Sequence, residues 1–151
     1  MASLHGVHVK PLAVHADDRG CFMEILREDD PFYSRFGQSS FSILYPGIVK
    51  AWHWHKRQDD LWFFVSGNAQ VGLYDIREDS PTRGQTQVLY LGEMNRSLLH
   101  IPPGVAHGYR ALGNAPVALV YYTTYSYDPA DELRLPWDEK GANFSWTTEN
   151  R

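Results

Sequence analysis

The chain has 151 residues, of which 43% are hydrophobic and 21% charged, a balance that excludes a disordered polymer and suits one domain with a sizeable core. The formal net charge of −4 offers no basic surface for nucleic acid or anionic membranes. No apolar stretch approaches the roughly 20 residues of a membrane helix, and the N-terminus lacks the apolar core of a secretory signal. Cys21 is the sole cysteine, so no internal disulfide can form. We therefore expect a soluble cytoplasmic protein with a single domain over residues 1–151.

The hydrophobic pattern along the chain is that of short β-strands. Runs of β-branched and aromatic residues recur between turn signals, whereas no helical periodicity is sustained. A short helix is predicted only over Asp30–Arg35, where Pro31 suits the first turn. Strands this short and this regularly spaced favour a closed barrel or sandwich over an open sheet. The predicted strands are Phe41–Leu44, Asp60–Val65, Ala69–Ile76, Thr86–Leu91, Ser97–Ile101 and Val117–Thr124.

The connection between two of these strands and both chain ends carry weaker signals. Ser66–Asn68 predicts a tight hairpin turn. Residues 1–15 are expected to form an N-terminal arm. Little periodic signal follows Trp137, so residues 137–151 are expected to form a loosely docked C-terminal tail.

Two histidines, one residue apart in an aromatic-rich and extended stretch, form the most informative motif. His53 and His55 would share one face of a strand. Asp60 follows five residues after His55, and His107 comes much later, within Ile-Pro-Pro-Gly-Val-Ala-His. The spacings G-x5-H-x-H-x4-D-x6-G and P-x-G-x2-H resemble the two motifs of the cupin superfamily, with Asp60 where glutamate is usual.

This resemblance implies an all-β cupin fold, a jelly-roll β-barrel in which the four side chains converge. Three imidazoles and one carboxylate suit a divalent transition metal, zinc first, held by His53, His55, Asp60 and His107. The same groups also suit acid–base chemistry on a bound substrate.

From His15 to about Trp146 the chain resembles a narrower family, the dTDP-4-dehydrorhamnose 3,5-epimerases. The resemblance implies a homodimer that acts on a nucleotide-linked 4-keto sugar. It also implies that His53 is the general base and Tyr121 the opposing acid, while Arg19, Glu24 and Gln38 help to hold the nucleotide diphosphate and sugar. The matching stretches are Asp18–Glu24, Phe36–Gln38, Asp75–Gly84, Ile101–Tyr109 and Val120–Thr124.

Three departures from that family pattern bear on the chemistry. Lys50 stands where the family has arginine, which keeps the charge for substrate binding but weakens bidentate phosphate contact. Asp60 stands where the family has a lysine that supports the enolate. The aspartate that pairs with the catalytic histidine has no counterpart after Trp146.

Two further resemblances leave the role of the histidines open. Gly37–Ser40, Pro46–Lys50, His53–His55 and Val65–Gly67 look like the zinc-binding C-terminal cupin of bifunctional capsular UDP-sugar reductase/epimerases, which implies the four-residue metal site. The run His53–Lys56 is similar to that of the dTDP-4-keto-6-deoxyhexose 3,4-ketoisomerases, which use it without metal. His53 is thus either a base or a metal ligand.

We predict an isomerase that epimerises C3 or C5 next to a C4 ketone, or that catalyses the related 3,4-keto shift. The alternatives are a non-catalytic small-molecule-binding cupin and a metal-dependent cupin oxygenase. The ordinary structural alternatives are interior histidines bonded to neighbours, a core role for Tyr121, and plain surface charge at Arg19 and Lys50. Three tryptophans either line a sugar pocket or belong to the core, namely Trp52, Trp54 and Trp62.

Overall fold

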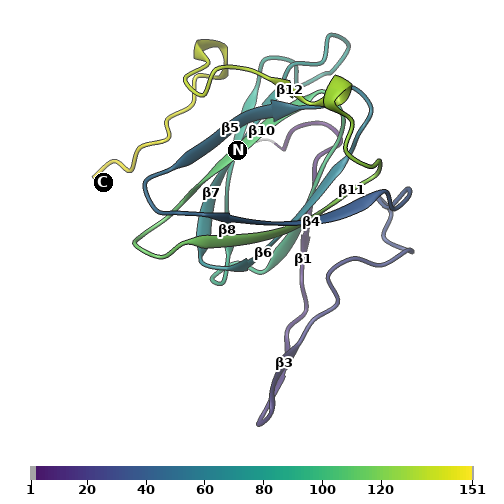
Figure 1. The fold of residues 1–151 in the computed structure, drawn as a ribbon, viewed down its shortest axis with the longest axis vertical. Coiled ribbons are helices and arrows are strands. Elements are labelled where there is room, and N and C mark those ends of the chain that lie inside the picture. The colour runs from purple at the N-terminus through teal and green to yellow at the C-terminus, as the bar shows by residue number, and fades with distance from the viewer. Residues whose placement is uncertain (1–2, 151) are drawn as a thin grey trace.

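The computed structural model describes residues 3–150. Twelve strands and two short 3-10 helices are assigned within this range, and ten of the strands form two antiparallel sheets that face each other (Figure 1). This confirms the predicted all-β class. The described part of the chain holds no helix that is both long enough and apolar enough to cross a membrane.

Each sheet combines strands that are distant in the sequence. The first sheet has the order β1-β9-β6-β11-β4, with bounds His8–Pro11, Ser97–Ile101, Asp60–Ser66, Val117–Thr123 and Gln38–Leu44. The second has the order β12-β5-β10-β7-β8, with bounds Leu133–Arg134, Val49–Trp54, Val105–Ala111, Asn68–Asp75 and Thr86–Gly92.

The turn at Ser66–Asn68 does not form the predicted hairpin. β6 pairs with β9 and β11, whereas β7 pairs with β8 and β10, so the chain crosses here from the first sheet to the second. Gly67 has a φ of 72°, and a Cβ at this position would lie 2.5 Å from the Pro116 carbonyl oxygen. Glycine therefore permits a sharp corner between the sheets rather than a turn within one of them.

The helix predicted at Asp30–Arg35 is also wrong, because this segment forms turns. The Asp30 carboxylate accepts bonds from Lys10 Nζ and the Arg27 amide. Phe32 packs against the outer face of the first sheet, beside Leu61 and Leu98. Burial of that aromatic side chain overrides the weak helical preference of so short a segment.

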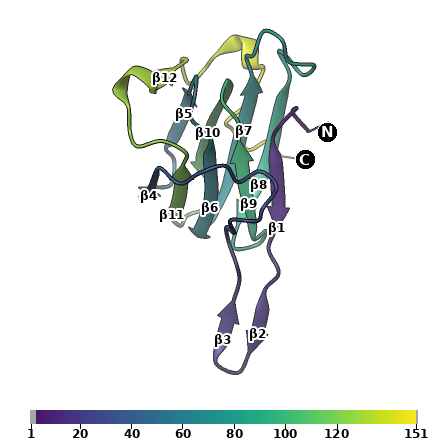
Figure 2. The same cartoon turned by 90° about the vertical axis from the view of Figure 1, so that its right-hand side faces the viewer.

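The hairpin that lies between β1 and β4 in the chain extends away from the sandwich. β2 (His15–Asp17) and β3 (Gly20–Phe22) form a hairpin that projects beyond the two sheets (Figure 2). All six strand residues are exposed, and Phe22 leaves 64% of its surface accessible. The residues that precede this hairpin belong to the body of the fold, since β1 pairs with β9.

The C-terminal segment is docked rather than loose. After the 3-10 helices η1 (Pro129–Asp131) and η2 (Lys140–Ala142), the rings of Phe144 and Trp146 pack on Trp52 from the outer side of the second sheet. Trp146 keeps only 7% of its surface exposed. Aromatic packing on Trp52 thus holds the C-terminal segment against the second sheet, although the sequence of this segment has no strand or helix pattern.

Candidate active site

One cavity gathers most of the residues that the motifs single out. Its lining combines residues from both sheets and from the segment around η1. The residues predicted from the sequence that line it are Gln38, Lys50, His53, His55, Asp60, His107 and Tyr121.

Strand register brings the distant histidines together. His53 on β5 is the pairing partner of His107 on β10, and His55 follows directly after the end of β5. Asp60 begins β6 in the opposite sheet, while Tyr121 on β11 pairs with Trp62 of β6. Residues at alternate positions of a strand point to the same side, so these side chains face the space between the sheets.

A compact buried group forms from three of the four predicted metal ligands. His55, Asp60 and His107 retain 5%, 4% and 3% of their surface, and one ligand atom from each lies within 4.8 Å of the others. His55 Nε2 lies 3.6 Å from Asp60 Oδ1, and His107 Nε2 lies 3.6 Å from Asp60 Oδ2. His53 is not part of this group.

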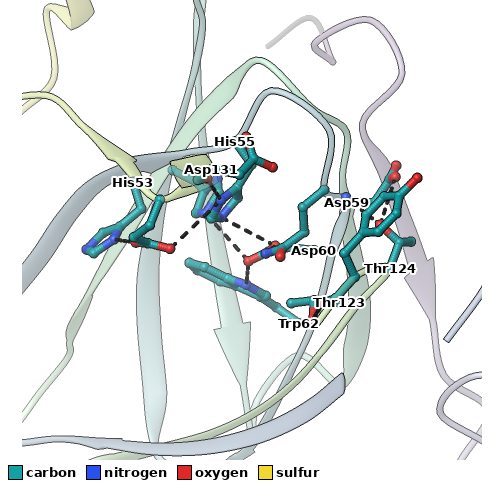
Figure 3. A network of polar contacts seen from close by, with 12 residues as sticks. His53, His55, Asp59, Asp60, Trp62, Thr123, Thr124 and Asp131 are labelled. Atoms are coloured by element: carbon teal, nitrogen blue, oxygen red, sulfur yellow. Dashed lines mark hydrogen bonds and ion pairs between the residues drawn. The ribbon is translucent and has the colours of Figure 1, made fainter. Parts of the chain in front are cut away.

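Each member of the group is held from outside by a hydrogen bond. Figure 3 shows His55 and Asp60 facing each other beside the Trp62 ring. His55 Nδ1 lies 2.7 Å from the Asp131 carbonyl oxygen, and His107 Nδ1 lies 2.9 Å from that of Val105. Two side chains donate to the Asp60 carboxylate, namely Gln58 through Nε2 at 2.8 Å and Trp62 through Nε1 at 3.1 Å.

The electrostatics of the group favour a neutral His107. Burial lowers the pKa of His107 to about 4, although the Asp60 carboxylate acts in the opposite direction. Nearby His55 and His53 lower it further. His107 is therefore uncharged at neutral pH, the state in which an imidazole nitrogen can bind a metal.

His53 has a different partner. Its Nδ1 lies 2.6 Å from Oε1 of Glu132, which follows η1 directly. Glu132 was not among the residues predicted from the sequence. The only available signal was the acidic run that follows the last long strand, at Asp128, Asp131 and Glu132. The structure thus supplies a carboxylate partner that the departures from the family pattern had appeared to remove.

A tyrosine and lysine cluster lies elsewhere on the cavity lining. Lys50 Nζ donates to Ser42 Oγ at 3.2 Å, and that hydroxyl lies 3.4 Å from the Tyr109 hydroxyl. Burial raises the pKa of the Tyr109 phenol, the contact with Ser42 lowers it, and nearby Tyr121 raises it. Tyr121 is partly buried against the main core with its side chain on the cavity lining.

Two residues predicted to bind substrate, Arg19 and Glu24, do not line this cavity. Arg19 lies in the β2–β3 hairpin and pairs with Asp17, while Glu24 pairs with Arg27 at 2.8 Å. Their proposed contact with substrate stays a prediction. Of the three tryptophans, Trp62 lines the cavity, whereas Trp52 and Trp54 belong to the aromatic cluster outside the second sheet.

The sequence of this chain is similar to those of known sugar-nucleotide epimerases and glycan biosynthesis proteins. The family model for dTDP-4-dehydrorhamnose 3,5-epimerase matches residues 1–151. The spore coat polysaccharide biosynthesis protein SpsL of Bacillus subtilis (strain 168) is 55% identical over 150 residues, which cover 98% of this chain and 99% of SpsL. The probable low-salt glycan biosynthesis epimerase Agl13 of Haloferax volcanii is 39% identical over 153 residues, with 99% and 98% covered.

Solved structures of sugar-nucleotide isomerases and epimerases share the fold of this chain. A dTDP sugar isomerase from Desulfovibrio desulfuricans G20 superposes with a TM-score of 0.89 at 34% identity, over 97% of this chain and 94% of that one. A Legionella pneumophila epimerase in complex with dTDP-4-keto-L-rhamnose has a TM-score of 0.84 at 26% identity, over 96% and 80% of the two chains. These likenesses confirm the predicted cupin jelly roll. The chain belongs to the dTDP-4-dehydrorhamnose 3,5-epimerase family.

Proposed function

We propose that the protein epimerises a nucleotide-linked 4-keto sugar at C3, C5 or both, in the biosynthesis of a surface polysaccharide or glycan. The observation that carries the proposal is the His53–Glu132 pair, which shares one cavity with Tyr121 in a fold of the epimerase family. The names of the relatives SpsL and Agl13 support the pathway, and the sugar nucleotide bound by the Legionella relative supports the substrate class.

In this proposal His53 removes the proton next to the ketone. Its Nδ1 is engaged by Glu132, so Nε2 is the nitrogen left to accept a proton. The carboxylate orients the ring and stabilises the imidazolium that forms after proton transfer. A carboxylate partner of this kind supports base catalysis better than an isolated imidazole does.

Tyr121 returns a proton from the other side of the sugar ring. Inversion at a carbon requires that the acid and the base act on opposite faces. Tyr121 lies on β11 of the first sheet and His53 on β5 of the second, so the two side chains approach the cavity from facing walls. This placement favours epimerisation over binding alone.

A divalent cation remains part of the proposal because of the charges around the cavity. Among the described lining residues Lys50 is the sole lysine or arginine, against the carboxylates of Asp60, Asp128 and Glu132. Proton removal next to a ketone creates negative charge on the oxygen, which such a cavity would disfavour without a further positive group.

We also propose a homodimer. The edge strand β4 presents Phe41 and Ile43, which are 63% and 52% exposed, and the β2–β3 hairpin extends free of its own sandwich. A second copy would cover these apolar groups, and its hairpin would bring Arg19 toward the cavity of the first. Light scattering at micromolar concentration should give twice the chain mass.

The cytoplasmic location predicted from the sole cysteine is kept with this proposal.

The proposed reaction is tested with dTDP-4-keto-6-deoxyglucose in deuterated water. An epimerase should place deuterium at C3, C5 or both, and NMR of the product should show inverted configuration there. A moved ketone would identify a 3,4-ketoisomerase instead. If the protein binds several 4-keto nucleotide sugars and incorporates deuterium into none, the proposal fails and a binding module becomes the better description.

A further inference from the structure

We infer that His55, Asp60 and His107 bind one divalent transition-metal ion, with zinc as the best fit, and that His53 lies outside the ligand set. This differs from the four-residue site predicted from the sequence. The use of the metal in catalysis rests on the proposed function.

The hydrogen bonds on the outer side of both rings determine which nitrogen faces Asp60 without a proton. His55 Nδ1 bonds to the Asp131 carbonyl and His107 Nδ1 to the Val105 carbonyl. A carbonyl oxygen can only accept, so the hydrogen in each bond belongs to Nδ1. In a neutral ring Nε2 then offers a bare lone pair. Two lone pairs and one carboxylate therefore surround a common point.

The distances match a metal site better than direct hydrogen bonds. Both Nε2 atoms lie 3.6 Å from an Asp60 oxygen, which is too long for a hydrogen bond. Zinc bonds of about 2.0–2.2 Å at tetrahedral angles hold neighbouring ligand atoms roughly 3.4 Å apart. The two nitrogen–oxygen separations are close to that value. The third separation, between the histidines, is no more than 4.8 Å.

The Asp60 carboxylate is fixed in the orientation that such a site needs. Gln58 Nε2 donates to Oδ1 and Trp62 Nε1 donates to Oδ2. Asp131 in turn accepts bonds from the Lys56 and Arg57 amides through its carboxylate, which holds the carbonyl that orients His55. Outer partners of this kind are the usual supports of metal ligands.

His53 differs from this group in its hydrogen bond and its exposure, although the second oxygen of its partner Glu132 lies 3.8 Å from His55 Nδ1. The Nδ1 atom of His53 is bonded to Glu132, and the His53 side chain is 24% exposed, against 6% for His55 and 3% for His107. The metal and the general base can therefore occupy the cavity together. All three residues of the group line the cavity, so an ion held by them would keep a coordination position for a further ligand, as catalytic zinc sites do. An ion bound there would supply Lewis-acid stabilisation of negative charge on a ketone oxygen.

The experiment strips the full-length protein with a chelator and reconstitutes it with Zn²⁺ in the absence of substrate. We expect one zinc per chain by elemental analysis, a rise in melting temperature on zinc addition, and a cobalt-substituted form with visible absorption bands. His107→Ala and Asp60→Asn should weaken zinc binding about 100-fold or more, and Trp62→Phe about tenfold. His53→Gln is the matched control and should bind zinc within about threefold of wild type. Circular dichroism checks that each variant is folded, and Asp60→Asn keeps the test available if His107→Ala does not fold.

Two results would overturn the inference. Wild-type protein that binds no zinc after reconstitution would leave the group as three acceptors around a water molecule. Loss of zinc from His53→Gln to the extent seen in His107→Ala would restore the four-residue set. The proposed function can fail separately from the metal site. A protein that binds zinc but exchanges no deuterium would keep the metal site and contradict the epimerase. A protein that exchanges deuterium fully without metal would support the epimerase and contradict the metal site.

Discussion

The Nδ1 atom of His53 lies 2.6 Å from Oε1 of Glu132, although the two residues are 79 positions apart in the chain. The short 3-10 helix η1 sets this contact, because it ends one residue before Glu132 and is itself held by the bond from the Ala130 amide to the Asp128 side chain. The pair makes His53 the best candidate for a general base in the cavity.

The carboxylate of Glu132 can be tested by an isosteric change. Glu132→Gln keeps the shape of the side chain but removes the charge that orients and stabilises the protonated ring. We expect the deuterium exchange rate to fall roughly 10²–10⁴-fold while KM changes little. The measurement is the rate of deuterium incorporation at saturating substrate. Glu139→Gln, outside the cavity lining, serves as the control. An unchanged rate in Glu132→Gln would remove Glu132 from the mechanism.

Tyr121 can be separated from its neighbour on the same strand. Tyr121→Phe removes one hydroxyl from the cavity and should lower the rate of net epimerisation about 10²–10⁴-fold, with substrate binding retained. Tyr122→Phe is the control, because Tyr122 packs on the outer side of the first sheet. His53→Asn should abolish both deuterium exchange and epimerisation. Equal activity of the two tyrosine variants would contradict the acid role of Tyr121.

Gly72 allows the C-terminal segment to dock on the second sheet. A Cβ there would lie 2.8 Å from Trp52 and 2.9 Å from both Phe144 and Trp146. Gly72→Ala should therefore lower the free energy of unfolding by about 1–3 kcal/mol, as overpacking does in other cores. Urea unfolding followed by tryptophan fluorescence measures the loss.

A double variant tests whether the loss acts through this cluster. Once Trp146→Ala has opened space beside Gly72, the further cost of Gly72→Ala should be smaller than in the wild-type background. Strict additivity of the two changes would argue that the clash is relieved elsewhere.

Asp75 should make the fold sensitive to acid. The residue is fully buried, and burial raises the pKa of its carboxyl, but bonds from Arg77, Ser80 and Thr82 outweigh this and hold that pKa below its usual range. A lowered pKa in the folded state contributes stability that is present above about pH 4, the unfolded value, and is lost as the pH falls toward the folded value. Urea unfolding between pH 7 and pH 2 should show that loss.

Removal of the Asp75 charge provides the comparison. Asp75→Asn should cost about 3 kcal/mol at pH 7, because Arg77 then loses a buried partner, and should flatten the dependence of stability on pH below 4. A variant with the same acid profile as the wild type would show that other carboxylates dominate the transition.

The sequence by itself determined the all-β class, the approximate places of the principal strands and the set of histidines, aspartate and tyrosine that share the cavity. Alternation within short strands and the spacing of H-x-H, Asp60 and His107 carry that information, because both depend on local geometry and on a shared motif. Local signals did not reveal that Gly67 joins two different sheets. The sequence of a glycine turn is the same whether the following strand pairs with the preceding one or enters the opposite sheet. They also predicted a helix where burial of Phe32 produces turns.

Only the tertiary structure decided which side chains become partners in the cavity. No spacing rule connects His53 with Glu132, which are brought together by η1 and the return of the chain along β12. His53 lies on β5 and His55 directly after it, and their hydrogen bonds differ, because His53 Nδ1 meets the Glu132 carboxylate and His55 Nδ1 meets the Asp131 carbonyl. Hydrogen bonds between distant segments set those partners, and for that reason the sequence pattern left base and ligand as alternatives for His53.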